Sequence, residues 1–349
     1  MIEKLINSDV LASTEELARS FSEGKPFRHV VVDDFLNGEF CAAVCAQFPD
    51  FRADHAVNEN EKLGGKAVRE KVRTLGSAFR DLDDLVRAPE FLALVGSITG
   101  IDDLQYDPFY FGGGTHENRD GQDLDPHIDF NYHPITGQHR RLNLIVYLNE
   151  GWDEAWGGSI QLHRDPHLEP GSDEIVTVAP LLNRCVIFET TEHSWHGFEK
   201  IRLPADRKNR SRKSFAVYYY TDTRPPAETA DEHSTIYVER HLPERFSAGM
   251  TMSAEDVEEI KRLLSRRDQH LQRLYRDNRA LRTELNQSRY GGGRDALAAS
   301  RLEEVPTDLK TAARLVHVLR HRVRELESST SWKITAPLRA VKRLLSGSS

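Results

Sequence analysis

Short runs of β-forming residues fill the middle of the chain, between Asp102 and Asp222. Gly, Pro, Asn and Asp separate these runs, and this alternation is typical of a β-sandwich or a β-barrel. We therefore expect a β-rich core over about residues 102–222. The pattern predicts strands over Gln105–Phe111, Arg141–Leu148, Ser159–His163, Cys185–Thr190 and Ser214–Thr221.

The N-terminal part of the chain combines helical spacing with one strand pattern. The segment Phe51–Lys71 is polar and has no period, so we expect a loop there. The spacing predicts helical segments over about Ser13–Ser22, Gly38–Phe48 and Phe79–Ile98, the last closed by Gly100, and a strand over Phe27–Val32 that ends at Asp33-Asp34.

A long charged helical pattern follows Pro225-Pro226, with a heptad seam that has Asn278 at an a position. The seam runs through Val257, Ile260, Leu264, Arg267, Leu271, Leu274, Asn278, Leu281 and Leu285. Gly291-Gly292-Gly293 interrupts it, and a second seam runs through Leu309, Ala312, Val316, Leu319, Val323 and Leu326. Two interpretations stay open: the helices fold onto each other as a hairpin, or Asn278 specifies a parallel homodimer.

The composition allows one domain of ordinary enzyme size and an appendage. The chain has 349 residues, of which 38% are hydrophobic and 29% are charged. The patterns divide it into a domain over residues 1–226, a linker over 227–250, a coiled coil over 251–290, a linker over 291–308, and a second helix with a basic tail over 309–349.

The charge is uneven along the chain. The net charge is −8, with acidic residues concentrated in the first two thirds and only basic residues at the C-terminal end. This distribution argues against nucleic-acid binding as the function.

The cysteine pattern favours a reducing compartment. Cys41, Cys45 and Cys185 form no C-x-x-C pair, and the first two are spaced for one face of a helix. The first residues lack the apolar core of a signal peptide, and no apolar run reaches the ~20 residues that would span a bilayer. We expect a cytosolic protein.

The most informative short motif is His127-x-Asp129, within Asp125-Pro126-His127-Ile128-Asp129-Phe130. In a strand, residues two apart share a face, so both side chains can bind one ion. His196 is the candidate third ligand, although His193 is close enough in the sequence to replace it. Two imidazoles and one carboxylate leave open positions that suit Fe(II) oxygen chemistry. Hydrogen-bonded or solvated roles are the expectation for His116, His133, His139, His163 and His167.

A candidate anion site lies downstream, where alternation places Arg212, Ser214 and Ala216 on one face of a strand. A guanidinium suits the distal carboxylate of a dicarboxylic acid, and a serine hydroxyl can add a hydrogen bond. The alternative is a surface arginine in the basic run Arg207–Lys213. Lys213 is expected to point to the other face.

The ordered set His127-x-Asp129, Arg141–Asn149, Trp152, Gly157-Gly158, His196 and Arg212-x-Ser214 closely resembles the Fe(II)/2-oxoglutarate dioxygenases, specifically their prolyl 4-hydroxylase-like branch. Val31-Val32-Asp33-Asp34-Phe35-Leu36 also resembles a segment near the start of such proteins, and the resemblance runs from about Phe27 to Asp222. It implies a double-stranded β-helix, or jelly roll, as the core. Together with the N-terminal helices and the C-terminal coiled-coil region that the spacing predicts, this gives an α+β fold.

The resemblance also implies roles for individual residues. His127, Asp129 and His196 would ligate Fe(II), Arg212 would bind the C5 carboxylate of 2-oxoglutarate, and Tyr147 would add a hydroxyl to that carboxylate. The segment between His196 and Arg212 is longer and more basic than in compact members, which leaves Lys213 and Arg210 as alternatives.

The implied reaction is hydroxylation of an unactivated C–H bond with O2 and 2-oxoglutarate, which releases succinate and CO2. The substrate is a small molecule, a glycan or a peptide. One alternative is a peptidyl-prolyl or other protein hydroxylase. Another is a non-catalytic cupin-like binding or scaffold protein that is dimerised by its coiled coil.

The C-terminal tail Ser331–Leu345 reads as a short basic amphipathic helix. Leu338, Val341 and Leu345 share one face, and no acidic residue is present, which suits peripheral contact with the inner face of an anionic membrane. An end-cap packed on the preceding helices is the alternative. Ser331–Arg339 also resembles the tails of bacterial polysaccharide-biosynthesis enzymes, which suggests cell-surface glycan assembly as the setting.

Overall fold

The computed structural model describes residues 2–51, 67–169, 171–243 and 245–290. The chain divides into two compact units, Met1–His133 with Gln138–His270 and Pro134–Gly137 with Leu271–Ser349. The first unit therefore continues past residue 226, where the sequence analysis ends the first domain. The physical reason is a set of ion pairs and strand contacts made by residues 230–270, which are described below.

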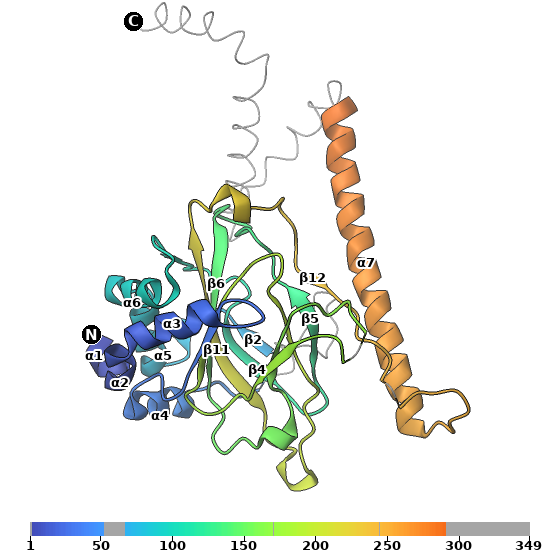
Figure 1. Cartoon of the computed structure of the whole chain (residues 1–349), viewed down its shortest axis with the longest axis horizontal. Coiled ribbons are helices and arrows are strands. Elements are labelled where there is room, and N and C mark those ends of the chain that lie inside the picture. Colours follow the sequence, from blue (N-terminus) through green and yellow to red (C-terminus); the bar gives the residue numbers. More distant parts are fainter. Residues whose placement is uncertain (1, 52–66, 170, 244, 291–349) are drawn as a thin grey trace, which may run out of the picture. The chain divides into compact units, whose positions relative to one another are not determined.

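Short helices precede the β core and gather on one side of it (Figure 1). The predicted helices near residues 13–22 and 38–48 are confirmed. The segment Phe79–Ile98 is two helices, because Pro89 starts a new helix and Ala88 before it is extended, with ψ at 138°. Gly100 closes the second one in the left-handed conformation, as expected. The bounds are α1 Ile2–Leu5, α2 Ser8–Ala12, α3 Thr14–Glu23, α4 Gly38–Ala46, α5 Ser77–Val86 and α6 Pro89–Thr99.

Two antiparallel sheets form a double-stranded β-helix-like core. The seven-stranded sheet has the order β1-β9-β6-β11-β4-β2, with β3 paired to β11. The five-stranded sheet has the order β12-β5-β10-β7-β8. The strands are β1 His29–Val32, β2 Ala67–Arg69, β3 Gln105–Tyr106, β4 Gly114–Asn118, β5 Leu124–Ile128, β6 His139–Tyr147, β7 Ile160–His163, β8 Ile175–Val178, β9 Cys185–Glu189, β10 Trp195–Phe198, β11 Arg212–Thr221 and β12 Ile236–Tyr237.

Several strand predictions need correction. The predicted strand Gln105–Phe111 stops at Tyr106, because the Asp107 carboxylate accepts hydrogen bonds from the backbone of Phe109 and Phe111 and forms a turn. The predicted loop Phe51–Lys71 contains β2, which pairs with β4. Residues 52–66 of that loop lie outside the described part of the chain. The sequence pattern predicts no strand at β4, β8, β10 or β12.

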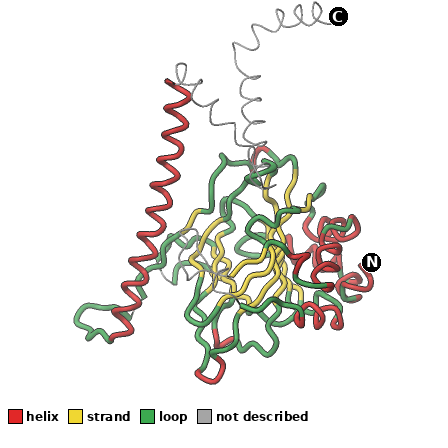
Figure 2. Tube along the Cα trace, turned by 180° about the vertical axis from the view of Figure 1, so that it is seen from behind, coloured by secondary structure: helices red, strands yellow, loops and turns green. Residues whose placement is uncertain are grey.

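The main hydrophobic core lies between the N-terminal helices and the seven-stranded sheet. Phe21, Phe79 and Phe91 from the helices are buried in one cluster with Leu144 of β6 and Phe215 of β11. Figure 2 shows these helices on one side of the strands. The helices thus cover one face of the seven-stranded sheet. Residues on its other face form part of the candidate site.

The helix α7, Ala254–Tyr290, agrees with the predicted helix over residues 251–290. Several of its seam leucines are exposed: Leu264 at 56%, Leu274 at 55% and Leu281 at 64%. The second seam over residues 309–326 and the tail Ser331–Leu345 lie outside the described residues. In the described part of the chain, no helix combines the length and apolar character needed to cross a membrane.

Candidate metal centre

Two adjacent strands bring the candidate ligands together. His127 on β5 lies opposite His196 on β10, and the two rings are 4.3 Å apart between centroids. Asp129 is the first residue beyond Ile128, the end of β5, so the expectation that it lies within the same strand was wrong. Ligand atoms of His127, Asp129 and His196 all lie within 4.8 Å of one another. The His196 Nε2 atom is 3.5 Å from Asp129 Oδ2, and the His127 Nε2 atom is 3.9 Å from Asp129 Oδ1.

Both histidines are oriented by the backbone two residues earlier. The Nδ1 atom of His127 is 2.9 Å from the Asp125 carbonyl oxygen, and that of His196 is 2.9 Å from the Ser194 carbonyl oxygen. A carbonyl only accepts hydrogen bonds, so each Nδ1 carries the proton. Each Nε2 then carries the lone pair that a metal requires. Burial lowers the pKa of His196, which favours the neutral form that binds metal.

Asp129 is held by two residues that the sequence analysis missed. Its Oδ2 atom accepts a hydrogen bond from Asn143 Nδ2 at 2.8 Å and forms an ion pair with Arg140 Nη2 at 3.0 Å. Burial alone would raise the pKa of Asp129, but Arg140 and the two ligand histidines outweigh it and hold the pKa well below its usual range. The carboxylate is thus charged and fixed in direction, with its negative charge balanced by Arg140.

Arg140 is itself almost completely enclosed, with 1% exposure. Its guanidinium donates to Asn143 Oδ1 at 3.1 Å and 2.7 Å and stacks 3.7 Å from the ring centroid of Tyr218. The available signal in the sequence was the pair of arginines, Arg140 and Arg141, before the apolar part of β6, with the amide Asn143 three residues after Arg140. Neither Arg140 nor Asn143 is near Asp129 in any local sequence pattern.

The other histidines lie outside the cluster. His193, the alternative ligand, is exposed on the turn before β10, and its backbone N–H donates to Thr191 Oγ1 at 3.1 Å. His133 lies 3.2 Å from Asp107, and His163 lies 2.7 Å from Asp173. His163 thus has a hydrogen-bonded role of the kind that we expected, and His133 lies beside a carboxylate.

A glycine allows the two ligand strands to approach. A Cβ atom added to Gly197, the neighbour of His196, would lie 2.6 Å from the Leu124 carbonyl oxygen of β5. A larger residue would force β5 and β10 apart and change the separation between His127 and His196.

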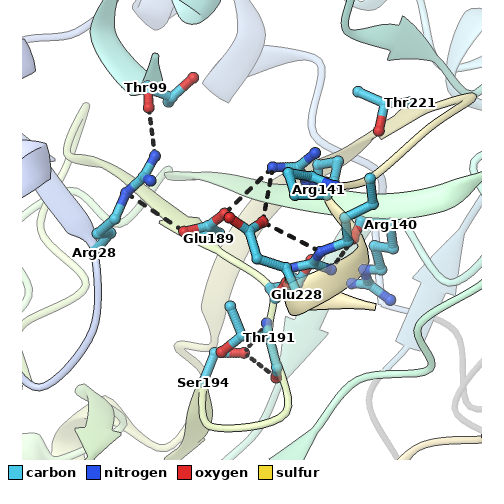
Figure 3. Close-up of polar contacts among 12 residues, drawn as sticks. Arg28, Thr99, Arg140, Arg141, Glu189, Thr191, Ser194, Thr221 and Glu228 are labelled. Carbon is cyan, nitrogen blue, oxygen red and sulfur yellow. Dashed lines mark hydrogen bonds and ion pairs between the residues drawn. The ribbon is translucent and has the colours of Figure 1, made fainter. Parts of the chain in front are cut away.

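A hydrogen-bonded turn leads the chain into His196. The Ser194 hydroxyl donates to the Thr191 carbonyl oxygen at 2.9 Å and accepts from the Thr191 N–H at 2.8 Å. Glu189, at the end of β9 before this turn, lies between Arg28 at 3.4 Å and Arg141 at 3.5 Å, as Figure 3 shows. These contacts anchor the segment that presents the Ser194 carbonyl to His196.

The three ligands line a cavity of about 80 Å³ together with Asn143, Arg212 and Ser214. Strand register places Arg212 opposite Asn118 and Ser214 opposite Tyr147. Asn118, a buried amide that also lines the cavity, was not singled out in the sequence. The predicted metal ligands and Arg212-x-Ser214 therefore share one enclosed space.

Arg212 is buried and points its guanidinium toward polar but uncharged partners. Its Nε atom donates to the Gly158 carbonyl oxygen at 2.6 Å, and its Nη2 atom donates to the Tyr147 hydroxyl at 3.2 Å. Among the described residues, no carboxylate forms an ion pair with it, and burial lowers its pKa. Gly158 has a φ of +74°, and a Cβ atom there would lie 3.1 Å from Arg212 Cδ, so glycine is needed for this contact.

The alternatives to Arg212 face a different space. Lys213 and Arg210 line a separate cavity of about 800 Å³ beside α4, together with Cys41 and Cys45. Arg210 donates to the Glu150 carbonyl oxygen at 2.6 Å, and Lys213 lies over the Phe48 ring. The strand register thus leaves Arg212 as the cation in the metal cavity.

The sequence of this chain is similar to an oxygenase family and to one known protein. Residues 113–220 match the 2OG-Fe(II) oxygenase superfamily. Prolyl 3-hydroxylase OGFOD1 from Mus musculus is 30% identical over 120 residues, which are 30% of this chain and 21% of that relative. The match thus spans about a fifth of the relative's own length.

Two solved structures are also similar to this chain. A prolyl hydroxylase from Trichoplax adhaerens, in complex with a peptide fragment of the hypoxia inducible factor oxygen degradation domain, has a TM-score of 0.42 and 17% identity and covers 62% of this chain and 94% of its own. A Pseudomonas putida prolyl-4-hydroxylase has a TM-score of 0.38 and 16% identity and covers 59% of this chain and 98% of its own.

Proposed function

We propose that this Fe(II)/2-oxoglutarate-dependent oxygenase, with its triad His127, Asp129 and His196, hydroxylates an unactivated C–H bond. The observation that supports the proposal is the pairing, in one cavity, of a metal-binding triad with a buried arginine that lacks a carboxylate partner among the described residues. When bound, Fe(II) supplies the chemistry by which O2 and 2-oxoglutarate hydroxylate a C–H bond and yield succinate and CO2.

The donor set fits Fe(II). Two neutral imidazoles and one carboxylate form the 2-His-1-carboxylate arrangement, which leaves positions for a co-substrate and O2. The Asp125 and Ser194 carbonyls fix the histidine tautomers, and Arg140 and Asn143 fix the carboxylate. The protein therefore presents the ligand atoms in the required protonation states before the metal arrives.

We assign the C5 carboxylate of 2-oxoglutarate to Arg212. A buried guanidinium is costly unless an anion compensates it, and a carboxylate can pair with it through two hydrogen bonds. Tyr147 already contacts the guanidinium, and Ser214 lines the same cavity on the same strand. These two hydroxyls would complete the hydrogen bonding of the carboxylate.

The substrate class is the second part of the proposal. The relative OGFOD1 is a prolyl 3-hydroxylase by name, so peptidyl proline is the first substrate to test. A glycan of the cell surface is the alternative that the tail Ser331–Arg339 suggests, and this tail lies outside the described residues. Its proposed contact with an anionic membrane is tested by liposome sedimentation of the full chain and of a chain that ends at Glu327.

We further propose that the exposed seam of α7 forms a parallel homodimer. Leu264, Leu271, Leu274 and Leu281 are exposed in the single chain, and Asn278 lies on the same seam. A buried asparagine at an a position commonly selects two parallel strands. Sedimentation of the full-length protein at micromolar concentration should give a dimer, and a monomer would contradict this assembly.

The decisive experiment measures 2-oxoglutarate turnover by the anaerobically purified full chain, supplied with Fe(II) and O2. We expect succinate release that a pool of proline-containing peptides stimulates, with products heavier by one oxygen atom. The His127→Ala protein is the control for metal dependence. Succinate release that no peptide stimulates, but that a glycan stimulates, would reject the peptide and retain the oxygenase.

A further inference from the structure

Residues 230–240 contact His127 and two residues that lie near the other metal ligands in the sequence. Near Asp129, the Asn131 amide donates to the Asp231 carbonyl oxygen at 2.8 Å and accepts from the His233 N–H at 3.0 Å. Near His196, the His233 ring lies 3.1 Å from the carboxylate of Glu192. The segment thus holds both the residues after Asp129 and the turn that leads to His196.

The same segment covers His127 directly. Ile236 and Tyr237 form β12, which pairs with β5 so that Tyr237 lies opposite His127. The Tyr237 ring stacks on the His127 ring, with centroids 5.1 Å apart and planes inclined by 27°. On its other side, the Tyr237 ring stacks on His270 of α7 at 4.7 Å and 23°. Because a stacked ring limits rotation about χ2, Tyr237 restricts the direction of the His127 Nε2 lone pair.

Arg240 connects the two ligand strands. Its Nη2 atom donates to the Leu124 carbonyl oxygen of β5 at 2.8 Å and to the Phe198 carbonyl oxygen of β10 at 2.8 Å. Its Nε atom donates to the Asp125 carboxylate at 3.1 Å. Asp125 is also the residue whose carbonyl accepts from His127 Nδ1. One side chain therefore sets both the spacing of β5 and β10 and the position of the residue that orients His127.

The first part of α7 holds this arrangement through buried charges. Asp123 and Asp125 have side chains that are 2% and 3% exposed. Arg262 pairs with Asp123 at 2.8 Å, and Arg266 pairs with Asp125 at 2.7 Å and also contacts Asp123. Buried carboxylates remain ionised only when cations compensate them, so this part of α7 is needed for the local structure of β5.

We propose that Tyr237 and Arg240 are positioning residues of the iron centre, and that Arg266 of α7 keeps them in place. They act on the metal through His127 and the spacing of β5 and β10 rather than by touching it. The catalytic domain would then include the segment 230–270, and metal affinity would depend on the beginning of α7. This inference rests on the proposed role of the triad as the iron site.

The test compares metal affinity with stability in full-length variants. Tyr237→Ala and Arg240→Met should each weaken anaerobic Fe(II) binding about 10-fold to 100-fold, as is usual for residues that orient metal ligands. The visible spectrum of the Co(II)-substituted protein should also change, because the ligand directions change. Calorimetric titration gives the affinity, and thermal unfolding of the metal-free protein gives the stability separately.

Conservative and matched variants distinguish positioning from a general loss of structure. Tyr237→Phe keeps the stacked ring and should restore both the affinity and the Co(II) spectrum. On α7, Arg266→Ala should weaken Fe(II) binding, whereas Arg267→Ala should not, because Arg267 is 61% exposed and pairs at 3.4 Å with Glu239, which is 44% exposed.

The outcomes separate this inference from the proposed function. If the unaltered chain binds no Fe(II), the proposed iron site itself fails. If the unaltered chain binds Fe(II) and both Tyr237→Ala and Arg240→Met bind it within twofold of that affinity, with unchanged Co(II) spectra, the positioning role is overturned. Weaker binding with a restored Tyr237→Phe spectrum supports the inference.

Discussion

The triad and Arg212 lie in one cavity, but the fold compensates the charge of Asp129 and does not compensate the charge of Arg212. The Asp129 side chain is 13% exposed and is paired with Arg140, so its charge is compensated without any ligand. Arg212 is buried, and among the described residues its hydrogen-bond acceptors are the Gly158 carbonyl and the Tyr147 hydroxyl. Under the proposed function, the first site would bind a cation on fixed ligands, and the second would be completed by an anion.

This difference indicates how the cavity favours its co-substrate. A dicarboxylate that reaches both sites can compensate Arg212 with one end and approach the metal ligands with the other. A monocarboxylate can do only one of these. Under the proposed function, the uncompensated guanidinium would contribute to selectivity, because the free energy of its burial would be recovered only with the correct anion.

The largest expected effect comes from removing a metal ligand. His127→Ala, Asp129→Ala and His196→Ala should each lower Fe(II) affinity by about 100-fold or more, because an incomplete shell loses a direct bond rather than an orienting contact. Anaerobic calorimetric titration measures it. His193→Ala is the matched control and should bind Fe(II) normally, since His193 is exposed on the preceding turn.

The second effect tests the compensated charge. Arg140→Met should lower the free energy of unfolding by about 3–5 kcal/mol, because the largely enclosed charge of Asp129 loses its cationic partner. Chemical denaturation of the metal-free protein measures this loss. Adding Asp129→Asn to Arg140→Met should recover much of the stability, and a double variant as unstable as the single one would contradict the charge argument.

The third effect concerns the co-substrate. Arg212→Ala should weaken 2-oxoglutarate binding by about 2–5 kcal/mol, or roughly 30-fold and more, and leave Fe(II) affinity unchanged. Titration of the Mn(II) protein with 2-oxoglutarate measures it. Lys213→Ala provides the comparison, since Lys213 lines the other cavity and should keep normal binding. Loss of binding in Lys213→Ala alone would move the role to that residue.

A smaller effect is expected at Asn143. Asn143→Ala removes the 2.8 Å hydrogen bond to Asp129 and should weaken Fe(II) binding about 10-fold, at the lower limit for a residue that orients a ligand. Asn149→Ala is a matched control, because it removes a buried amide outside the triad. The Asn149 amide donates to the Pro180 carbonyl oxygen at 2.8 Å. Equal Fe(II) affinity in the two variants would show that Asn143 has no special role.

The smallest effect concerns the stability of the uncompensated site. Arg212→Met replaces a buried charge by an apolar side chain of similar length, so the metal-free protein should unfold with an equal free energy or one up to about 1 kcal/mol higher. Denaturation in the absence of 2-oxoglutarate measures it. A loss of several kcal/mol would mean that a partner compensates Arg212 and that the contrast with Asp129 is wrong.

The sequence by itself determined the elements with strong local signals. The runs at Arg141–Leu148 and Cys185–Thr190 became β6 and β9, because β-branched residues in a buried strand leave little alternative. Alternation along a strand also paired His127 with Asp129 and Arg212 with Ser214, because these residues are two apart. His196 was a candidate for a different reason, which is its place in the order of motifs along the chain.

Tertiary structure alone decided which distant residues complete the site. Arg140 and Asn143 reach Asp129 because β6 crosses the cavity, and Tyr237 reaches His127 because a two-residue strand pairs with β5. A strand as short as Ile236–Tyr237 has no detectable period, and its pairing partner lies more than a hundred residues earlier in the chain. Such contacts arise from backbone pairing and charge compensation across the fold, which no local pattern of residues encodes.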